Sequence, residues 1–78
     1  MEPPIIALAR EMCIAANHQW CSWSDLEIAA EFDEDVRSTG GVVSARGWLA
    51  AALVARPDLA DARVPKGHWA SGLLKEEP

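Results

Sequence analysis

The sequence predicts a mainly α-helical fold: a small three-helix domain whose C-terminal residues 60–74 form either a β-hairpin or a helix. Fourteen of the 78 residues are alanine, which loses almost no side-chain entropy in a helix. Half of the residues are apolar, and they recur at helical spacing in three separate segments. A chain of this length forms one domain, which we expect to span residues 1–78 with a net stability on the order of 3–5 kcal/mol.

The first helix is predicted over residues 4–16. Pro3 and Pro4 precede it, and a proline in the first turn loses no intrahelical hydrogen bond. The apolar residues Ile5, Leu8 and Met12 then follow at helical spacing. Asn17 is a suitable C-terminal stop.

The second helix is predicted over residues 25–33, after a polar and aromatic connection. Ser24 followed by Glu27 forms a capping box, in which each residue accepts a backbone N–H of the other. Acids at 33–35 suit a helix C-terminus poorly, so we expect the helix to end there and residues 37–43 to form a loop. The residues expected on the inward face are Leu26, Ala29 and Ala30, with Ile28 pairing with Phe32.

The third helix is predicted over residues 45–56, with Ser44 as its cap and Pro57 as its end. Trp48, Leu49, Ala52 and Leu53 recur at helical spacing and should face the core.

The segment after the third helix is predicted to begin with a short helical turn at 57–59. A turn within R-V-P-K-G-H-W follows, with a strand on either side. Leu73 and Leu74 should pack back onto the core, and residues 75–78 should form a loose, disordered tail.

Charge is distributed unevenly along this acidic chain, whose net charge is −5. Residues 25–35 contain six acids and no base, whereas residues 36–70 contain five bases and two acids. The overall charge disfavours nonspecific nucleic-acid binding, because an acidic domain repels phosphate.

The sequence also indicates a cytoplasmic protein. It has no apolar stretch long enough to cross a membrane, and its start, MEPPII, lacks the positive charge of a signal peptide. Two cysteines fit a reduced pair better than a disulfide framework.

Catalytic and metal-binding patterns are weak in this sequence. Cys13, His18, Cys21 and His68 are metal-ligand types, but their spacing lacks the paired knuckle of a structural zinc site. His18 with Cys21 could form a dyad, yet no motif supplies an oxyanion hole. We therefore expect a protein that is not an enzyme and needs no cofactor or metal.

Two segments, S-D-L-E-I-A-A-E-F and V-V-S-A-R-G-W-L-A-A-A-L, together resemble the core of helix-turn-helix and winged-helix domains, over about residues 24–69. The resemblance implies that the later helix enters the major groove and that R-V-P-K-G-H-W forms a wing hairpin. The predicted helices are about ten residues apart, whereas this family uses a turn of three or four. The candidate phosphate-contacting residues are Arg37, Arg46, Arg63 and Lys66.

The acidic stretch and two neighbouring tryptophans are the candidate partner-binding features. The tryptophans either cover the core between the first two helices or serve as interface anchors, and the acids form either a solvated helix face or a docking face. The candidate residues are Trp20, Trp23, Glu27, Glu31, Asp33, Glu34 and Asp35.

Three functions follow in order of preference. The first is a non-enzymatic protein-binding module, such as a phage or mobile-element inhibitor of a basic or nucleic-acid-binding host protein. The second is a winged-helix-like DNA-binding regulator. The third is self-association as a homodimer through the alanine-rich third helix.

Overall fold

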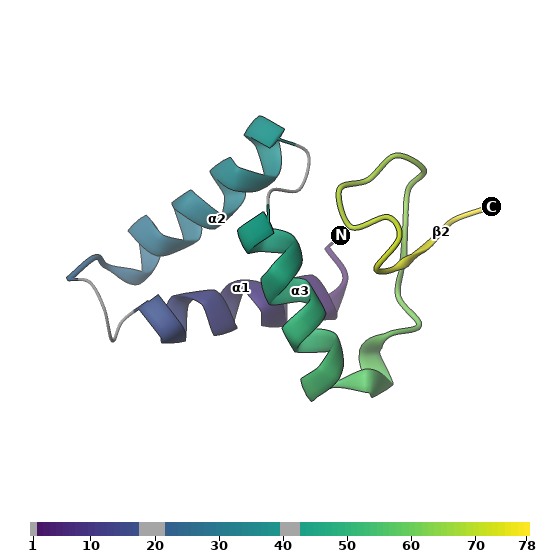
Figure 1. The fold of residues 1–78 in the computed structure, drawn as a ribbon, viewed down its shortest axis with the longest axis horizontal. Coiled ribbons are helices and arrows are strands. Elements are labelled where there is room, and N and C mark those ends of the chain that lie inside the picture. The colour runs from purple at the N-terminus through teal and green to yellow at the C-terminus, as the bar shows by residue number, and fades with distance from the viewer. Residues whose placement is uncertain (1, 18–21, 40–42) are drawn as a thin grey trace.

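Three helices are followed by a short helical turn and a two-stranded sheet in the computed structural model (Figure 1). It describes residues 2–17, 22–39 and 43–78, without the side chains of residues 35–39, 43 and 44. The elements are α1 (Pro4–Asn17), α2 (Asp25–Thr39), α3 (Val43–Ala55), the 3-10 turn η1 (Pro57–Leu59), β1 (Arg63–Val64) and β2 (Lys75–Glu76). The prediction of a mainly helical three-helix domain is confirmed. No helix within the described ranges has the length and apolar character needed to cross a membrane.

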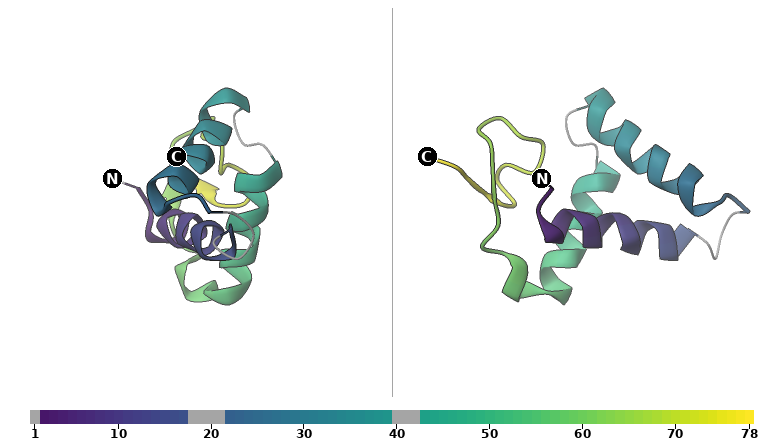
Figure 2. Two further views of the ribbon diagram at one scale, coloured as in Figure 1. Left: turned by 90° about the vertical axis from the view of Figure 1, so that its left-hand side faces the viewer. Right: turned by 180° about the vertical axis from the view of Figure 1, so that it is seen from behind.

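Helix α1 is the centre of the packing, because α2 and α3 each contact α1 more extensively than they contact each other (Figure 2). It begins at Pro4, as the sequence predicts, and runs one residue beyond the predicted end. Its core face includes Ile5, Ile6 and Ala9, all at most 2% exposed. Alanine at such a position lets a neighbouring element approach closely, and α3 crosses α1 (Figure 1).

Helix α2 is longer than the sequence predicts: it continues through the acids at 33–35 and ends at Thr39. The predicted loop at 37–43 is therefore wrong over residues 37–39 and at Val43. The acids lie within the helix instead of at its C-terminus, and Asp33 is paired with Arg10 of α1. That pairing and the extra turn remove the unfavourable interaction with the helix dipole on which the shorter prediction depended.

The predicted inward face of α2 is also partly wrong. Leu26 is 83% exposed and Ala30 is exposed, while Ile28 and Phe32 are 3% and 2% exposed. The two buried residues lie one turn apart, so a single narrow stripe meets the core. Branched and aromatic side chains bury more apolar area than alanine, and this difference selects the stripe that turns inward.

Helix α3 confirms the predicted apolar stripe. Ala45, Leu49 and Ala52 are fully buried, and Trp48 and Leu53 are half-buried against them. The helix spans Val43–Ala55 and not 45–56, so Ser44 lies in its first turn and the predicted Ser44 cap is wrong. Its end just before Arg56 and Pro57 agrees with the effect of the proline. The predicted short helical turn follows at once as η1.

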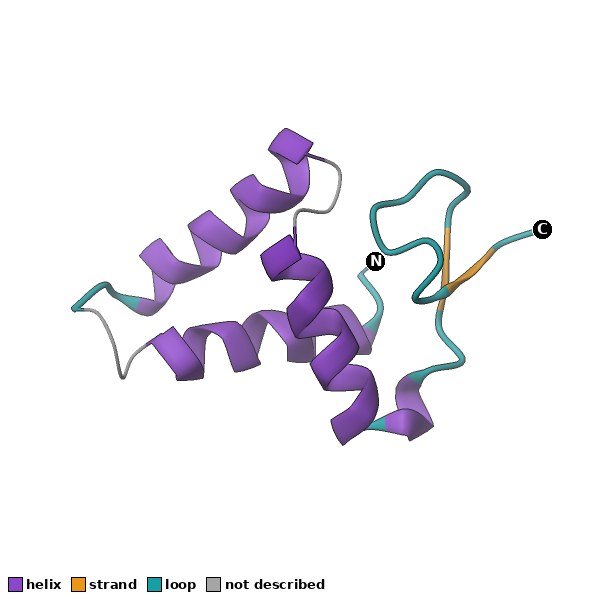
Figure 3. Ribbon diagram, in the orientation of Figure 1, coloured by secondary structure: helices purple, strands orange, loops and turns teal. Residues whose placement is uncertain are grey.

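The C-terminal strands pair parallel, so the predicted β-hairpin, and with it the wing of the winged-helix resemblance, is wrong (Figure 3). A hairpin reverses the chain once. Here the connection between the strands contains successive turns, closed by His68 N–H donating to the Pro65 carbonyl and Ser71 N–H to the His68 carbonyl. Gly67 and Gly72 have φ angles of 82° and 95°, a region that glycine enters without steric cost. After these turns the chain reverses once more, so β2 runs in the same direction as β1.

The C-terminal segment belongs to the core. Val64 and Ala70 are fully buried, Leu74 is 3% exposed and Leu73 packs against the core, which confirms the prediction for the two leucines. The loose tail predicted for 75–78 is not what the structure shows at its start: Lys75–Glu76 forms β2, and the Glu77 N–H donates to the Val64 carbonyl at 2.8 Å. Backbone pairing with a buried strand accounts for this difference.

Candidate functional site

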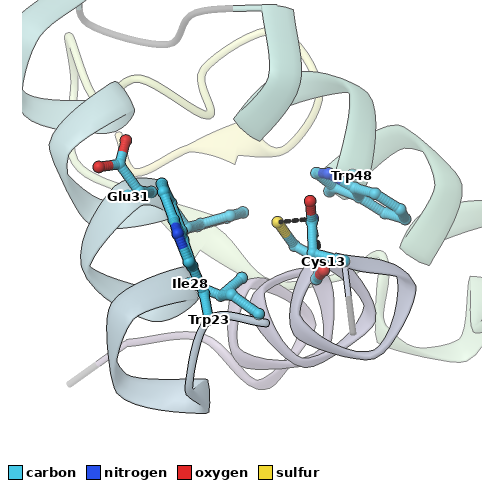
Figure 4. Close-up of a pocket in the computed structure, with 7 residues that line it drawn as sticks. Cys13, Trp23, Ile28, Glu31 and Trp48 are labelled. Carbon is cyan, nitrogen blue, oxygen red and sulfur yellow. Dashed lines mark hydrogen bonds between the residues drawn. The ribbon is translucent and has the colours of Figure 1, made fainter. Parts of the chain in front are cut away.

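A pocket of about 340 Å³ lies where α1, α2 and α3 meet (Figure 4). It is open to solvent, and its walls are mainly apolar. Figure 4 shows Trp23 and Ile28 on one side and Trp48 on the other, with Cys13 between them. The residues that line it are Cys13, Asn17, Trp23, Ile28, Glu31, Phe32 and Trp48.

The capping box at the start of α2 positions Trp23. The backbone N–H of Ser24 donates to Glu27 Oε1 at 3.1 Å, and the Glu27 N–H donates to Ser24 Oγ at 3.3 Å. This confirms the predicted capping box. Trp23 precedes the cap, and Ile28 is the fourth helical residue, the two positions that form a hydrophobic staple. Trp23 is thereby held at the pocket while 46% of it stays exposed.

The opposite walls come from α1 and α3. Asn17 ends α1 and donates from Nδ2 to the Cys13 carbonyl at 2.8 Å, which satisfies one of the last carbonyls of the helix. Cys13 is 8% exposed and accepts a longer contact from the same amide, at 3.5 Å. Trp48 of α3 is half-buried and contributes its ring to the lining.

The carboxylates of α2 differ in what they contact. Glu31 lines the pocket, and Glu34 is exposed one turn further along; within the described part of the chain neither has a cationic partner. Glu27 is used by the cap. Asp33 lies beside Arg10, whose Nε and Nη2 donate to Asp33 Oδ1 at 3.0 and 2.9 Å.

Arg10 links the N-terminus, α1 and α2. Its Nη2 also donates to Glu2 Oε2 at 2.8 Å, and its guanidinium lies 5.2 Å from the centroid of the Phe32 ring. The hydrogen bond with Arg10 lowers the pKa of Glu2, and the bonds with Glu2 and Asp33 raise the pKa of Arg10. This network connects the N-terminus, α1 and α2, and it gives Asp33 a cationic partner within the domain.

The structure therefore brings together only part of the predicted partner site. Trp23 and Glu31 line one pocket, and Glu34 lies about one turn after Glu31 in the same helix. Trp20 and the Asp35 side chain fall outside the described residues. Trp48, Phe32, Cys13 and Asn17 were not predicted as site residues. The spacing of Trp23 and Ile28 around the capping box is the pattern of a hydrophobic staple, so the sequence could have indicated that these two residues lie together. The contribution of Trp48 to the pocket depends on how α3 crosses α1.

The candidate DNA-contacting residues come from different elements, and one of them, Arg46, donates hydrogen bonds within the domain. Arg46 Nη1 donates to the carbonyl of Trp69 at 2.6 Å and to that of Ser71 at 3.2 Å, so it fastens the C-terminal turns to α3. Arg63 and Lys66 are exposed in the C-terminal segment. The side chain of Arg37 falls outside the description.

Of the possible metal and dyad residues, the structure describes Cys13 in α1 and His68 in the C-terminal segment. Half-buried His68 accepts the Ala70 N–H at Nδ1, at 3.0 Å, and its ring lies tilted against Trp69. His18 and Cys21 fall outside the described residues. Among the residues that are described, no three of the types His, Cys, Asp and Glu lie close enough together to hold a metal ion.

Comparison of the chain with protein-family models, curated proteins and solved structures found no match.

Proposed function

We propose that this domain is a non-enzymatic, cytoplasmic protein-binding module whose docking site is the pocket between Trp23 and Trp48. The observation that carries the proposal is an apolar, solvent-open pocket next to Glu31, a carboxylate without a cationic partner in the described structure. Nearly half of Trp23 is left in water. Burying such an aromatic surface against a partner is favourable, and tryptophan is enriched among residues that dominate binding energy.

The charge of the domain supports a basic partner. The net charge is −5, and the exposed Glu31 and Glu34 lie at or beside the pocket. Such carboxylates attract a positively charged protein and orient its approach. A nucleic-acid-binding protein has a basic surface of this kind, so an inhibitor of such a protein, of the sort encoded by phages and mobile elements, is the specific role we propose.

Affinity capture with matched variants tests this proposal. The wild type should retain a partner that Trp23→Ala loses, and Glu31→Lys with Glu34→Lys should weaken capture. Asp33 is left unchanged, because replacing it would break its contact with Arg10. Asp61→Lys is the control: this exposed acid lies between η1 and β1, away from the pocket. Equal capture by all variants would reject the pocket as the docking site.

A DNA-binding regulator is the second candidate, and one observation favours it. Helix α2 ends at Thr39 and α3 begins at Val43, so three residues separate them, the spacing of a helix-turn-helix and not the ten predicted. The exposed side of α3 is evidence against DNA binding, because the side chains of Gly47, Ala50 and Val54 offer no hydrogen-bond donor to base edges. A gel shift at low salt, weakened in the double variant Arg63→Ala, Lys66→Ala, would support DNA binding.

Self-association through α3 stays a prediction. Light scattering at micromolar concentration measures it directly, and a monomeric mass would reject it.

A further inference from the structure

We infer that the partner segment bound in the Trp23–Trp48 pocket is a basic amphipathic helix, which inserts one large apolar side chain and places cations beside Glu31 and Glu34. This inference rests on the proposed function and names the class of partner. It follows from the size of the pocket, the surrounding secondary structure and the position of the acids.

The size of the pocket indicates a single anchor. A volume of about 340 Å³ is near the lower end for ligand pockets, about 300–1,000 Å³. One aromatic side chain buries roughly 150–250 Å² of surface, so a single such anchor is the occupant that we expect in a space of this size. Trp23, Trp48 and Phe32 are arranged to contact its apolar surface.

The secondary structure around the pocket favours a helix over an extended segment. Every described lining residue belongs to α1, α2 or α3, except Trp23, which precedes the Ser24 cap of α2. The strands lie elsewhere, beyond α3 (Figure 3). An extended peptide would find no sheet edge to pair its backbone N–H and C=O groups. A helix satisfies these groups internally, so it loses no backbone hydrogen bonds on docking.

The acids determine the charge and the spacing of the partner. Glu31 and Glu34 are three residues apart, which places them on adjacent turns of the same side of α2. A partner helix with its anchor in the pocket presents residues three, four and seven positions away on the same side. Lysine or arginine at those positions meets the two carboxylates, and acidic residues there are repelled.

A second copy of this chain does not have that chemistry. On α1 the only base is Arg10, which is bound to Glu2 and Asp33. On α3 the only base is Arg46, which is bound to backbone carbonyls. Neither α1 nor α3 therefore offers a basic face, and two α2 helices, each with six acids and one arginine, would repel each other. The occupant is a helix of a different protein.

Synthetic peptides of about fifteen residues test the inference with the full chain. The probe is alanine-based, with one tryptophan anchor and lysines four and seven positions later. The matched peptides replace the lysines by glutamate or the anchor by alanine. Binding is followed by the indole ¹⁵N–¹H signals of Trp23 and Trp48, assigned through Trp→Phe variants.

The lysine peptide should shift both indole signals and bind about tenfold more tightly than the glutamate peptide at low salt, with the difference reduced at high salt. The protein variant with Glu31→Lys and Glu34→Lys should reverse the preference, and Asp61→Lys should keep it. Because each variant is compared on two peptides, a change in stability alone cannot produce the reversal.

Two results would overturn the inference. One is equal binding of the lysine and glutamate peptides. The other is that, without peptide, the indole signals of Trp23 and Trp48 move when the protein is diluted, while added peptide leaves them unchanged; this would identify a second copy as the occupant. If a natural partner is still captured through Trp23 in either case, the proposed function stands and only the partner class is wrong. If Trp23→Ala leaves capture unchanged, the proposed function fails as well.

Discussion

Arg46 connects the C-terminal turns to α3, and replacing it with alanine tests how the small sheet is held on the helices. Its guanidinium donates to the Trp69 and Ser71 carbonyls at 2.6 and 3.2 Å. Trp69 in turn lies edge-on to Phe32, with 6.3 Å between the ring centroids. Arg46→Ala removes both hydrogen bonds and leaves the two carbonyls to water.

The expected cost is a large fraction of the total stability. A hydrogen bond to a charged group contributes about 1.5–3 kcal/mol, and the two bonds here share one nitrogen, so we assign about 2–3 kcal/mol to the pair. The whole domain is expected to have about 3–5 kcal/mol. At 4–8 °C per kcal/mol for a chain of this size, the melting temperature should fall by roughly 10–20 °C.

Urea denaturation followed by far-UV circular dichroism measures the change, with two controls. Arg46→Met retains most of the aliphatic stem, so comparing it with Arg46→Ala separates packing from hydrogen bonding. Arg56→Ala removes an exposed arginine whose ion pair with Asp58 should contribute little. The reasoning is refuted if both Arg46 variants lie within about 0.5 kcal/mol of the wild type, which is the range of ordinary surface substitutions.

Three further predictions concern the core, the pH dependence and the helix cap. Phe32→Ala should cost about 3–5 kcal/mol and abolish cooperative unfolding, whereas Leu26→Ala, at an 83% exposed position, should leave the urea midpoint nearly unchanged. The pKa of Glu2 is below its ordinary value of 4.5 because of Arg10, so its contribution is present above pH 4.5 and is lost as the pH falls through the folded-state value. At pH 7 the free energy of unfolding measured in urea should be lower for Glu2→Gln than for the wild type, by less than about 1 kcal/mol for this exposed pair. In strong acid the two proteins should have the same free energy of unfolding, and a difference that persists there would contradict this account. Ser24→Ala should cost about 1 kcal/mol through the lost cap, and an unchanged melting temperature would show that the capping box contributes nothing.

The site was predictable from local sequence only where its geometry is local. Trp23, Ser24 and Glu27 lie within one turn of each other, and the capping box between the last two was predicted correctly. Glu31 belonged to the predicted acidic stretch, but its position at a pocket depends on which stripe of α2 turns inward. The selection of Ile28 and Phe32 over Leu26 required α1 and α3 as partners, because helical spacing alone allows more than one apolar face.

The pairing of Asp33 and of Arg46 within the domain is also a tertiary result. Each is a charged residue in a surface-like sequence context, and each is paired with a group 23 or more residues away along the chain. Sequence reasoning assigned both to partners outside the domain. Long-range pairing cannot be read from spacing within a segment.

By itself, the sequence determined the helical class, the three helix starts to within two residues and the capping box at Ser24, because these depend on interactions within a few residues of one another. It also determined the excess of acids, from which we propose a basic partner. Only the tertiary structure decided that α2 runs on to Thr39, that the C-terminal strands pair parallel and that Trp23 and Trp48 face one pocket. Those features depend on contacts between distant segments, whose free energy outweighs the local preferences that predicted otherwise.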